Sequence, residues 1–283
     1  MSDRLGFLPY LPCSWPQSRP SPTIPDTVSV IIPAYNATAT IAYALRSCAW
    51  QTRRPDEVVV VDDASTDGTG LVALAWSAED KPATFGVSRL DCNRGAAAAR
   101  NAAIRLCSGE FVFYLDADDM MPDGRIAATL QEFYDTGADV IYGQKQWFEH
   151  DHTQRKADRR VSEPAPGNIV GGTGFGCGAV AVRRSVHVED GLWLDESMSV
   201  GEDAELLVAC VSAGLQVHCS TNVYCWRRKS EGSLRNRGNW GLMRSWLRVK
   251  HEAWLDGYGV RPMPLADRGR VLAARREAGW AEI

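Results

Sequence analysis

The sequence predicts an α/β fold in which helices flank a mostly parallel sheet. Short runs of β-branched residues recur in the first half of the chain, and segments with helical periodicity separate them. Polar clusters follow the ends of these runs. Continuous apolar runs are typical of strands that are buried on both faces of a parallel sheet. Ligands bind beyond the carboxyl ends of such strands, so the polar clusters are the candidates for a functional site.

The first half of the chain alternates regularly between the two kinds of element. Strands are predicted at residues 28–32, 58–61, 84–88 and 111–115. Helices are predicted at residues 38–50, 67–78 and 93–107, with Asp67 and Asn93 as the caps of the last two. The polar clusters at the strand ends lie at residues 33–36, 62–67 and 116–119.

The second half is less regular. It suggests a strand at residues 139–142, a polar segment at 144–160, a glycine-rich loop at 171–178 and a strand at 179–182. A helix is expected from Asp203 to Gly214, followed by two short strands at 217–219 and 223–226 and an amphipathic helix at 239–256. These patterns predict a proline-rich arm at 1–26, one globular domain at 27–235 and a helical extension at 236–283.

Composition excludes several classes of protein. With 283 residues, of which 45% are hydrophobic, the chain can bury a sizeable core, so it is not a disordered protein. The net charge of -4 provides no basic field for nucleic acid. The eight cysteines lack the spacing of a zinc site, which favours a reducing, cytoplasmic setting. No apolar stretch approaches the roughly 20 residues that span a bilayer, so we expect a soluble or peripherally membrane-associated protein.

Two acidic clusters could carry chemistry. Asp116, Asp118 and Asp119 follow an apolar strand directly, and carboxylates that crowd one turn favour a hard divalent ion such as Mg²⁺ or Mn²⁺. The alternative is a solvated acidic turn. Asp62 and Asp63 end the second strand, where a carboxylate can accept a hydrogen bond from a nucleobase N–H, although ordinary turn chemistry also explains them.

Five segments in fixed order together resemble glycosyltransferase family 2 across about residues 27–230. They are VSVIIPAYN at 28–36, VVDDASTDGT at 60–69, NRGAAAARNAAI at 93–104, GEFVFYLDADD at 109–119 and GED at 201–203. The resemblance implies the GT-A fold. It also implies an inverting enzyme that uses a nucleotide-diphosphate sugar, UDP- or dTDP-linked by preference, and a Mn²⁺ or Mg²⁺ cofactor bound through a DXD motif.

The resemblance assigns roles to particular residues. Asp203 is the implied catalytic base, with Glu202 in reserve, and Asp118 and Asp116 are the implied metal-binding carboxylates. The implied nucleotide-binding residues are Pro33, Ala34, Tyr35, Asn36, Asp63, Arg94, Arg100, Asp116 and Ala117. Arg100 could equally be a structural pairing residue, and Asp203 could be a helix N-cap.

One segment departs from the family pattern. Many relatives have a histidine, or an arginine with a serine, in the loop after the base helix, whereas residues 224–233 read YCWRRKSEGS and contain no histidine. Arg227, Arg228 or Lys229 could neutralise the diphosphate instead, or these cations could form a solvated basic loop. The third metal ligand is therefore open, and His218 fits a structural position on a strand better.

The tryptophan-rich extension has three interpretations. Trp240, Met243, Trp246, Leu247 and Trp254 form an apolar stripe with interleaved basic residues. It could lie on an anionic membrane, pack on the domain or on a second subunit of a homodimer, or stack on an acceptor sugar. The acceptor itself could be a glycan, a lipid-linked glycan, a protein or a small molecule.

Rival functions share parts of this pattern. A sugar-phosphate nucleotidyltransferase would open with a glycine-rich loop, but the first strand here ends in PAYN. A dinucleotide-dependent oxidoreductase would carry G-x-G-x-x-G after a strand, and none is present. A domain that binds nucleotide sugars without transferring them is the non-enzyme alternative, and the presence of both Asp118 and Asp203 disfavours it.

Overall fold

The computed structural model describes residues 26–76, 82–148, 155–157 and 176–229, together with eight positions further on: 243, 245, 247, 250, 251, 270, 273 and 274. All but the last residue of the predicted N-terminal arm lies outside the described residues. So do residues 171–175 of the predicted glycine-rich loop and most of the predicted C-terminal extension.

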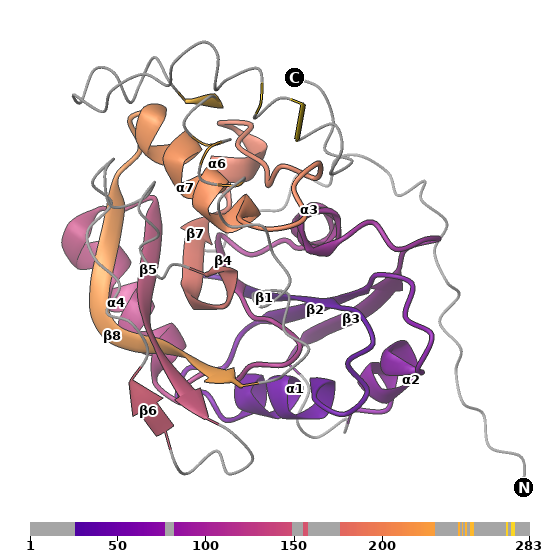
Figure 1. Ribbon diagram of the computed structural model, residues 1–283. Helices are drawn as coiled ribbons and strands as arrows, with labels where there is room; N and C mark the ends of the chain where they lie inside the picture. Colours follow the sequence, from indigo (N-terminus) through magenta and orange to yellow (C-terminus); the bar gives the residue numbers. More distant parts are fainter. Residues whose placement is uncertain are drawn as a thin grey trace, which may run out of the picture.

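One eight-stranded sheet forms the centre of the molecule (Figure 1). Seven strands lie in the order β3-β2-β1-β4-β7-β5-β6, and β8 pairs with β5. The strands are β1 (Val28–Ala34), β2 (Glu57–Asp62), β3 (Thr84–Arg89), β4 (Phe111–Tyr114), β5 (Val140–Phe148), β6 (Arg155–Ala157), β7 (Val180–Arg183) and β8 (Val217–Arg228). The first four are mutually parallel, whereas β7 is antiparallel to β4 and β5. The expected α/β fold with a mostly parallel sheet is confirmed.

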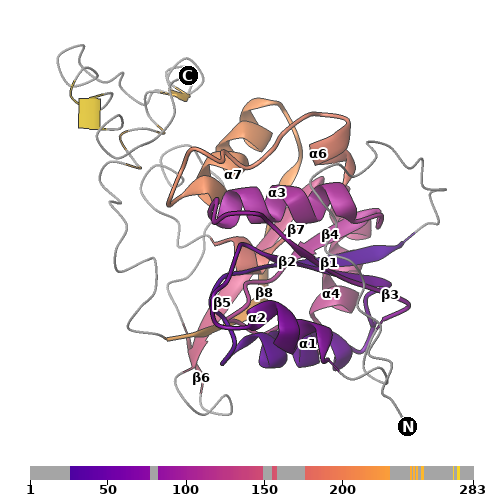
Figure 2. The ribbon, with the colours of Figure 1, turned by 90° about the vertical axis from the view of Figure 1, so that its right-hand side faces the viewer.

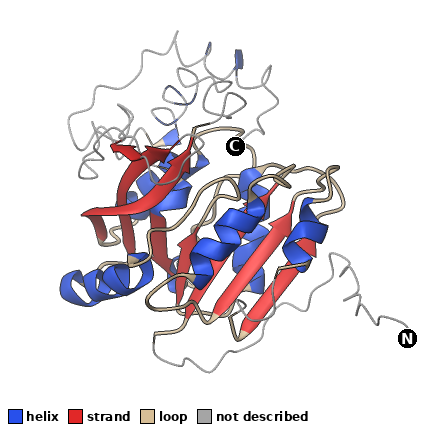
Figure 3. Cartoon of the chain, turned by 90° about the horizontal axis from the view of Figure 1, so that it is seen from below, coloured by secondary structure: helices blue, strands red, loops and turns tan. Residues whose placement is uncertain are grey.

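Helices cover both faces of the sheet (Figures 2 and 3). The helices α1 (Ile41–Ala49), α2 (Thr69–Leu74) and α4 (Arg125–Thr136) pack on one face. The opposite face carries α3 (Ala96–Leu106), α6 (Ser185–Val188) and α7 (Glu202–Ser212). Successive strand side chains point to opposite faces, so Val30 packs toward α1 while its neighbour Ile31 packs toward α3.

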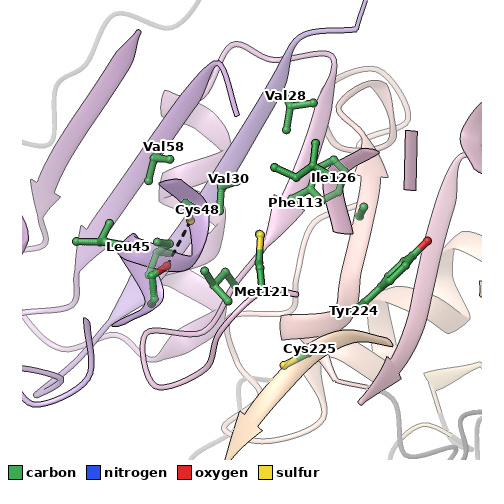
Figure 4. Close-up of a cluster of buried hydrophobic side chains, with 14 of the residues drawn as sticks. Val28, Val30, Leu45, Cys48, Val58, Phe113, Met121, Ile126, Tyr224 and Cys225 are labelled. Carbon is green, nitrogen blue, oxygen red and sulfur yellow. Dashed lines mark hydrogen bonds between the residues drawn. The ribbon is translucent and has the colours of Figure 1, made fainter. Parts of the chain in front are cut away.

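The core on the α1 face joins elements that are distant in sequence (Figure 4). Val28 and Val30 from β1, Cys48 from α1, Ile126 from α4 and Tyr224 from β8 are all completely buried within it. Burying a large apolar side chain stabilises a fold by about 1.5–3 kcal/mol. This core therefore holds β8 against the parallel half of the sheet.

Register brings the strand ends to one edge. Ala34 pairs with Asp62, and Asp62 pairs with Arg89 on the other side. Ile31 pairs with Tyr114 in β4, so the acidic turn after β4 emerges beside the segment after β1. As expected for parallel strands, the polar clusters predicted from the sequence gather at the carboxyl edge of the sheet.

Two strands differ from the sequence-based prediction. The strand β5 continues to Phe148, through part of the segment predicted to be a polar connection, and β8 is one strand instead of two. Their pairing is irregular between Tyr142 and Lys145. Gly143 sits at this irregularity, where an added Cβ would collide with the Tyr224 ring. The bulge interrupts the alternation of apolar residues in these strands. The sequence pattern therefore predicts the end of a strand at a point where β5 and β8 continue.

Helix ends also differ. The helix α1 begins at Ile41 instead of Thr38, and α2 ends at Leu74 instead of near Ala78. Gly95, not Asn93, occupies the N-cap position of α3, and the Asn93 amide donates instead to the carbonyl of Asp63 at 3.3 Å. Likewise Gly68, not Asp67, occupies the N-cap position of α2, although the Asp67 carboxylate still accepts a hydrogen bond from the Thr69 backbone N–H at 3.0 Å.

Candidate active site

The three carboxylates of the acidic turn after β4 differ in their exposure to solvent. Asp118 is exposed, and Asp116 is about one third exposed. Asp119 is buried, and it accepts hydrogen bonds from the Arg228 backbone N–H at 2.9 Å and from the Cys225 thiol at 3.2 Å. Burial and the two neighbouring carboxylates raise the pKa of Asp119 well above its usual range. Asp119 thus anchors β8, and only Asp116 and Asp118 are available to a ligand.

Arg100 connects this turn to the helix that carries the predicted base. Its side chain is only 6% exposed, and its guanidinium contacts Asp116 Oδ1 and Glu202 Oε1, each at 2.7 Å. Burial tends to raise the pKa of Asp116, but the adjacent Arg100 outweighs it and holds the value below the usual range. The pairing role foreseen for Arg100 is confirmed. Through it, α3, the turn after β4 and the start of α7 form one cluster.

Asp203 lies in the first turn of α7. Gly201 is the N-cap residue of that helix, so Asp203 does not cap it. Its Oδ1 accepts a hydrogen bond from the Ala204 backbone N–H at 2.7 Å. Burial and the adjacent Glu202 carboxylate raise the pKa of Asp203 to about 6. A carboxylate with this pKa is a stronger base than a solvated aspartate and is still ionised near neutral pH.

Lys145, from β5, is a charged residue of this cluster that the sequence did not single out. Its side chain is only 5% exposed. A Cβ added to Gly176 would lie 2.9 Å from Lys145 Nζ and 3.8 Å from Asp203 Oδ2, so both groups border the same glycine. The positive charge of Lys145 acts on Asp116 as well as on Asp203. The signal that could have identified Lys145 is its place in the predicted polar segment, the first part of which belongs to β5 in the structure.

The aspartates after β2 face inward. Asp62 accepts a hydrogen bond from the Ser65 backbone N–H at 2.8 Å and pairs with Arg89 at 2.7 Å. Asp63 is 2% exposed, and its two oxygens accept the backbone N–H groups of Arg94 and Gly95 at 2.7 and 2.8 Å. Asp63 therefore fixes the start of α3, while each of its oxygens retains a second lone pair for a further donor.

The segment after β1 completes this side of the site. Asn36 adopts a positive φ of 48°, and its side-chain oxygen accepts the Thr66 backbone N–H at 2.9 Å. The Tyr35 ring is 51% exposed, so it is accessible to a ligand. Pro33 pairs within the sheet beside Val61, and Ala34 is buried.

Three predicted cations differ in where they point. Arg94 pairs with Glu196 at 2.7 Å and is 52% exposed. Arg227 stacks on the Trp147 ring at 4.8 Å, and its guanidinium is close enough to Asp119, Asp116 and Asp118 for these carboxylates to raise its pKa despite burial.

Arg228 crosses the acidic turn directly. Its Nε donates to the carbonyl of Asp118 at 3.2 Å, and its guanidinium stacks on Phe148 at 4.7 Å. The backbones of Met120 and Trp226 form a β-bridge beside it, which brings the end of β8 onto the turn. Of the three cations, Arg227 and Arg228 therefore lie next to the acidic turn, and their contact with a diphosphate stays a prediction.

Part of the C-terminal extension packs behind the base helix. Met243 and Leu247 are buried against Met198, Val200 and the half-buried Ala204. Lys250 contacts Asp195 at 2.8 Å and Glu205 at 2.7 Å, and His251 lies 3.2 Å from Glu205. For these residues, packing on the domain is confirmed. Trp240, Trp246 and Trp254 lie outside the described residues.

Two surveys of the described part of the chain bear on ligands and membranes. No cluster of three or more His, Cys, Asp or Glu side chains there has the arrangement of a metal site. Among the helices of the same residues, none combines the length and the apolar character that crossing a lipid bilayer requires.

The comparisons with known proteins agree with this architecture. Residues 29–187 match the family model described as Glycosyl transferase family 2. The succinoglycan biosynthesis protein ExoU of Rhizobium meliloti is 33% identical over 67% of this chain and 58% of its own length. The Escherichia coli protein WfgD, a UDP-Glc:alpha-D-GlcNAc-diphosphoundecaprenol beta-1,3-glucosyltransferase, is 28% identical over 59% of this chain and 68% of its own. The chain thus spans little more than half the length of ExoU.

Solved structures show the same fold. TarS of S. aureus in complex with UDP-GlcNAc superposes with a TM-score of 0.64 at 21% identity, covering 88% of this chain and 71% of the TarS chain. The mannosyltransferase PcManGT of Pyrobaculum calidifontis, in complex with GDP-Man and Mn²⁺, gives a TM-score of 0.61 at 23% identity over 93% and 73% of the two chains.

Proposed function

The chain belongs to glycosyltransferase family 2 and has the GT-A fold, and we propose that it transfers a sugar, with inversion, from a nucleotide-diphosphate sugar to an acceptor hydroxyl. The observation that carries this proposal is the contact of Arg100 with both Asp116 and Glu202. This contact joins the candidate donor-binding turn to the helix of the candidate base, so that one substrate complex could touch both.

The donor nucleotide would bind along the carboxyl edge of the sheet. Asp63 keeps lone pairs for an imide N–H, which favours a uracil or thymine base, and the exposed Tyr35 ring offers a surface for stacking. Pro33, Ala34, Asn36 and Ala117 would shape the pocket, and Arg100 would hold Asp116 near the ribose. Arg94 would approach the nucleotide only by leaving Glu196.

Asp116 and Asp118 suit Mg²⁺ or Mn²⁺. Two carboxylates on one turn are a small donor set, but Mg²⁺ is commonly held by one or two carboxylates together with substrate phosphates and water. A bound divalent ion would stabilise the negative charge that develops on the leaving β-phosphate. Arg227 lies beside the same carboxylates and Arg228 crosses the turn, so they would contribute positive charge to the diphosphate where relatives use a histidine.

Asp203 would act as the base. As the acceptor oxygen attacks the anomeric carbon, its proton passes to the Asp203 carboxylate, and the bond from the anomeric carbon to the β-phosphate oxygen breaks. The nucleoside diphosphate leaves with the bonding electrons. The raised pKa of Asp203, about 6, matches this task better than that of a solvated aspartate. A direct displacement of this kind inverts the anomeric configuration.

Organisation and setting complete the proposal. Residues 27–235 would form the catalytic domain, with residues 236–283 as a helical extension that braces it. None of the seven cysteines that the structure describes forms a disulfide, which favours the cytoplasm as the site of action.

Two substitutions test the proposal by separating binding from transfer. Asp203→Asn should leave binding of UDP-sugars nearly intact and abolish transfer, whereas Asp118→Asn should weaken only the metal-dependent part of donor binding. Asp123→Asn, on an exposed carboxylate a few residues further along, is the matched control and should change neither. Calorimetric titration of a panel of nucleotide sugars with and without Mn²⁺, combined with product analysis, measures both effects.

Two results would contradict the proposal. If the Asp203→Asn protein transfers sugar at the normal rate, Asp203 is not the base. Donor binding without transfer or hydrolysis by the wild-type protein, across acceptors and metals, would favour the alternative of a nucleotide-sugar-binding domain without transferase activity.

A further inference from the structure

Lys145 is a buried cation at the centre of the site, yet neither the motifs nor the proposed mechanism uses it. It lies on β5, near the bulge at Gly143 that separates this part of the strand from its regular first half. Its side chain is 5% exposed. Burying an ammonium is costly unless negative charge or hydrogen bonds compensate it, so a buried lysine at a candidate active site calls for a specific explanation.

Geometry indicates which groups Lys145 serves. Gly176 precedes the 3-10 turn η1 (Cys177–Ala179), and a methyl group at position 176 would touch the Lys145 ammonium and approach the Asp203 carboxylate. Lys145 and Asp203 therefore face the same small space from β5 and α7. Because Gly176 has an extended backbone with φ of -174°, which any residue can adopt, the glycine is needed here for space and not for conformation.

The charges around Asp203 come from several elements. Among the described residues, Glu202 on α7 repels the Asp203 carboxylate, while Arg100 on α3 and Lys145 on β5 attract it. The Cys177 thiol of η1 is also close, but burial raises its pKa so far that it stays neutral. Arg100 is already held by Glu202 and by the turn after β4. Lys145 is the second cation that acts on the Asp203 carboxylate, and it comes from a different element, β5.

We propose that Lys145 is a positioning residue for the transfer reaction: its ammonium holds the Asp203 carboxylate ionised and oriented toward the space beside Gly176, where the acceptor hydroxyl must bind. This inference rests on the proposed role of Asp203 as the base. Without Lys145, burial and Glu202 would act on Asp203 with only Arg100 and the Ala204 backbone N–H to oppose them. An opposite charge within about 4–6 Å typically lowers the pKa of a carboxyl group by about 1–3 units.

The test is the titration of Asp203 itself, followed by ¹³C NMR of the labelled side-chain carboxyl group and assigned with Asp203→Asn. In Lys145→Met, which keeps most of the side-chain volume, the midpoint should rise because one of the cations that favour the carboxylate is removed. Lys145→Arg should restore most of the wild-type midpoint because it restores the charge. Arg105→Met removes equal charge from the exposed end of α3 and should leave the midpoint unchanged.

The transfer rate gives the second measurement. If Lys145 acts through Asp203, the acid limb of the pH profile should move upward in Lys145→Met by the same amount as the NMR midpoint, a shift that a purely structural role would not cause. Thermal unfolding verifies that each variant is folded, and Lys145→Gln replaces Lys145→Met if the latter does not fold.

Two outcomes would overturn the inference: an unchanged Asp203 midpoint in a folded Lys145→Met or Lys145→Gln protein, or a midpoint in Lys145→Arg that rises as far as in Lys145→Met. The NMR titration needs no turnover. A wild-type protein that transfers no sugar would therefore contradict the proposed function, while the midpoints would still decide whether Lys145 controls the ionisation of Asp203.

Discussion

Opposing influences determine the pKa of Asp203. Burial and Glu202 favour its protonated form, whereas the Ala204 backbone N–H, Arg100 and Lys145 favour the carboxylate, and the balance leaves its pKa at about 6. A base must be unprotonated to accept the proton of an acceptor hydroxyl. The same value therefore controls two measurable quantities, the rate of transfer and the stability of the fold.

The rate should follow the carboxylate fraction of Asp203. Below pH 6 the turnover number should fall about tenfold per unit, and above pH 7 it should be nearly constant, because Asp203 is then ionised. Initial rates at saturating donor and acceptor between pH 4.5 and 8.5 measure this profile, with circular dichroism to verify that the protein stays folded. A rate that is independent of pH across this range would exclude Asp203 as the limiting base.

Stability should show the opposite dependence on pH. The folded-state pKa of about 6 exceeds the ordinary value of 3.8, so the folded protein holds the proton more tightly than the unfolded chain does. The contribution of protonated Asp203 to the free energy of unfolding is complete below about pH 4 and is lost as the pH rises through 6. Asp203→Asn should consequently be more stable than wild type at pH 8, by about 1–3 kcal/mol, and equally stable at pH 4. Urea unfolding at both pH values measures the difference, and a gain that is the same at both would contradict this account.

Gly176 offers a second test at single-residue scale. In Gly176→Ala the new methyl group would displace the flexible end of Lys145 from beside Asp203, while the backbone stays unstrained. We expect transfer to slow at least tenfold with little change in melting temperature. Gly124→Ala, where nothing lies within 4 Å of an added Cβ, should leave transfer unchanged. A Gly176→Ala protein with wild-type kinetics would show that this space is not used by the reaction.

How far such residues can be predicted from sequence depends on the range of their contacts. Asp116, Asp118 and Asp203 were identified because they lie in short segments with a recognisable pattern. Arg100 was left undecided because its partners lie 16 and 102 residues away, and their pairing is a property of the fold. Lys145 was missed because its burial depends on β8 and Gly176, which no local pattern specifies.

At the scale of elements, the sequence predicts strands in both halves of the sheet, but it predicts their bounds better in the parallel half than in β5 and β8. The strands β1, β2 and β4 are short, buried, mostly apolar runs, so their pattern is clear, whereas the partly exposed edge strand β3 gives a weaker signal. In contrast, β5 and β8 carry Gln144, Lys145 and Arg227, polar residues of the site or next to it. These residues interrupt the apolar pattern, which therefore predicts a β5 that ends too early and a β8 that is divided in two.

The edge of the sheet opposite the candidate site contains a buried carboxylate whose removal should affect stability but not donor binding. Glu57, at the start of β2, accepts the hydroxyl of Ser29 at 2.5 Å and the backbone N–H of Ser108 at 2.7 Å, which ties β1, β2 and the turn before β4 together. Leaving buried donors without a partner costs about 1–3 kcal/mol each. We expect Glu57→Ala to lower the free energy of unfolding by about that amount and to leave donor affinity unchanged. The exposed Asp135→Ala is the matched control and should alter neither. Loss of donor affinity in a folded Glu57→Ala protein would show that the two edges are coupled.

At the scale of the whole molecule, the question is whether the C-terminal extension belongs to the folded unit. Leu247 is completely buried and Met243 nearly so, and Met243 also lies where a side chain on Gly201 would collide with it. Gly201 immediately precedes Glu202 and Asp203, and Lys250 pairs with Glu205 one turn further along α7. The extension therefore braces the helix that carries the candidate base, through apolar contacts on one side and an ion pair on the other.

Leu247→Ala tests this brace. If residues 243–251 fold with the domain, the substitution should lower the free energy of unfolding by about 2–5 kcal/mol, because it leaves a cavity among Met198, Val200 and Ala204. Leu71→Ala, at a position that is 60% exposed, should change it by no more than about 0.5 kcal/mol. Since the brace contacts α7 and not the nucleotide-binding edge, transfer should decline more than donor binding does. Equal stability of Leu247→Ala and wild type in urea would mean that the extension does not fold with the catalytic domain, and the domain would then have to hold Asp203 in place without it.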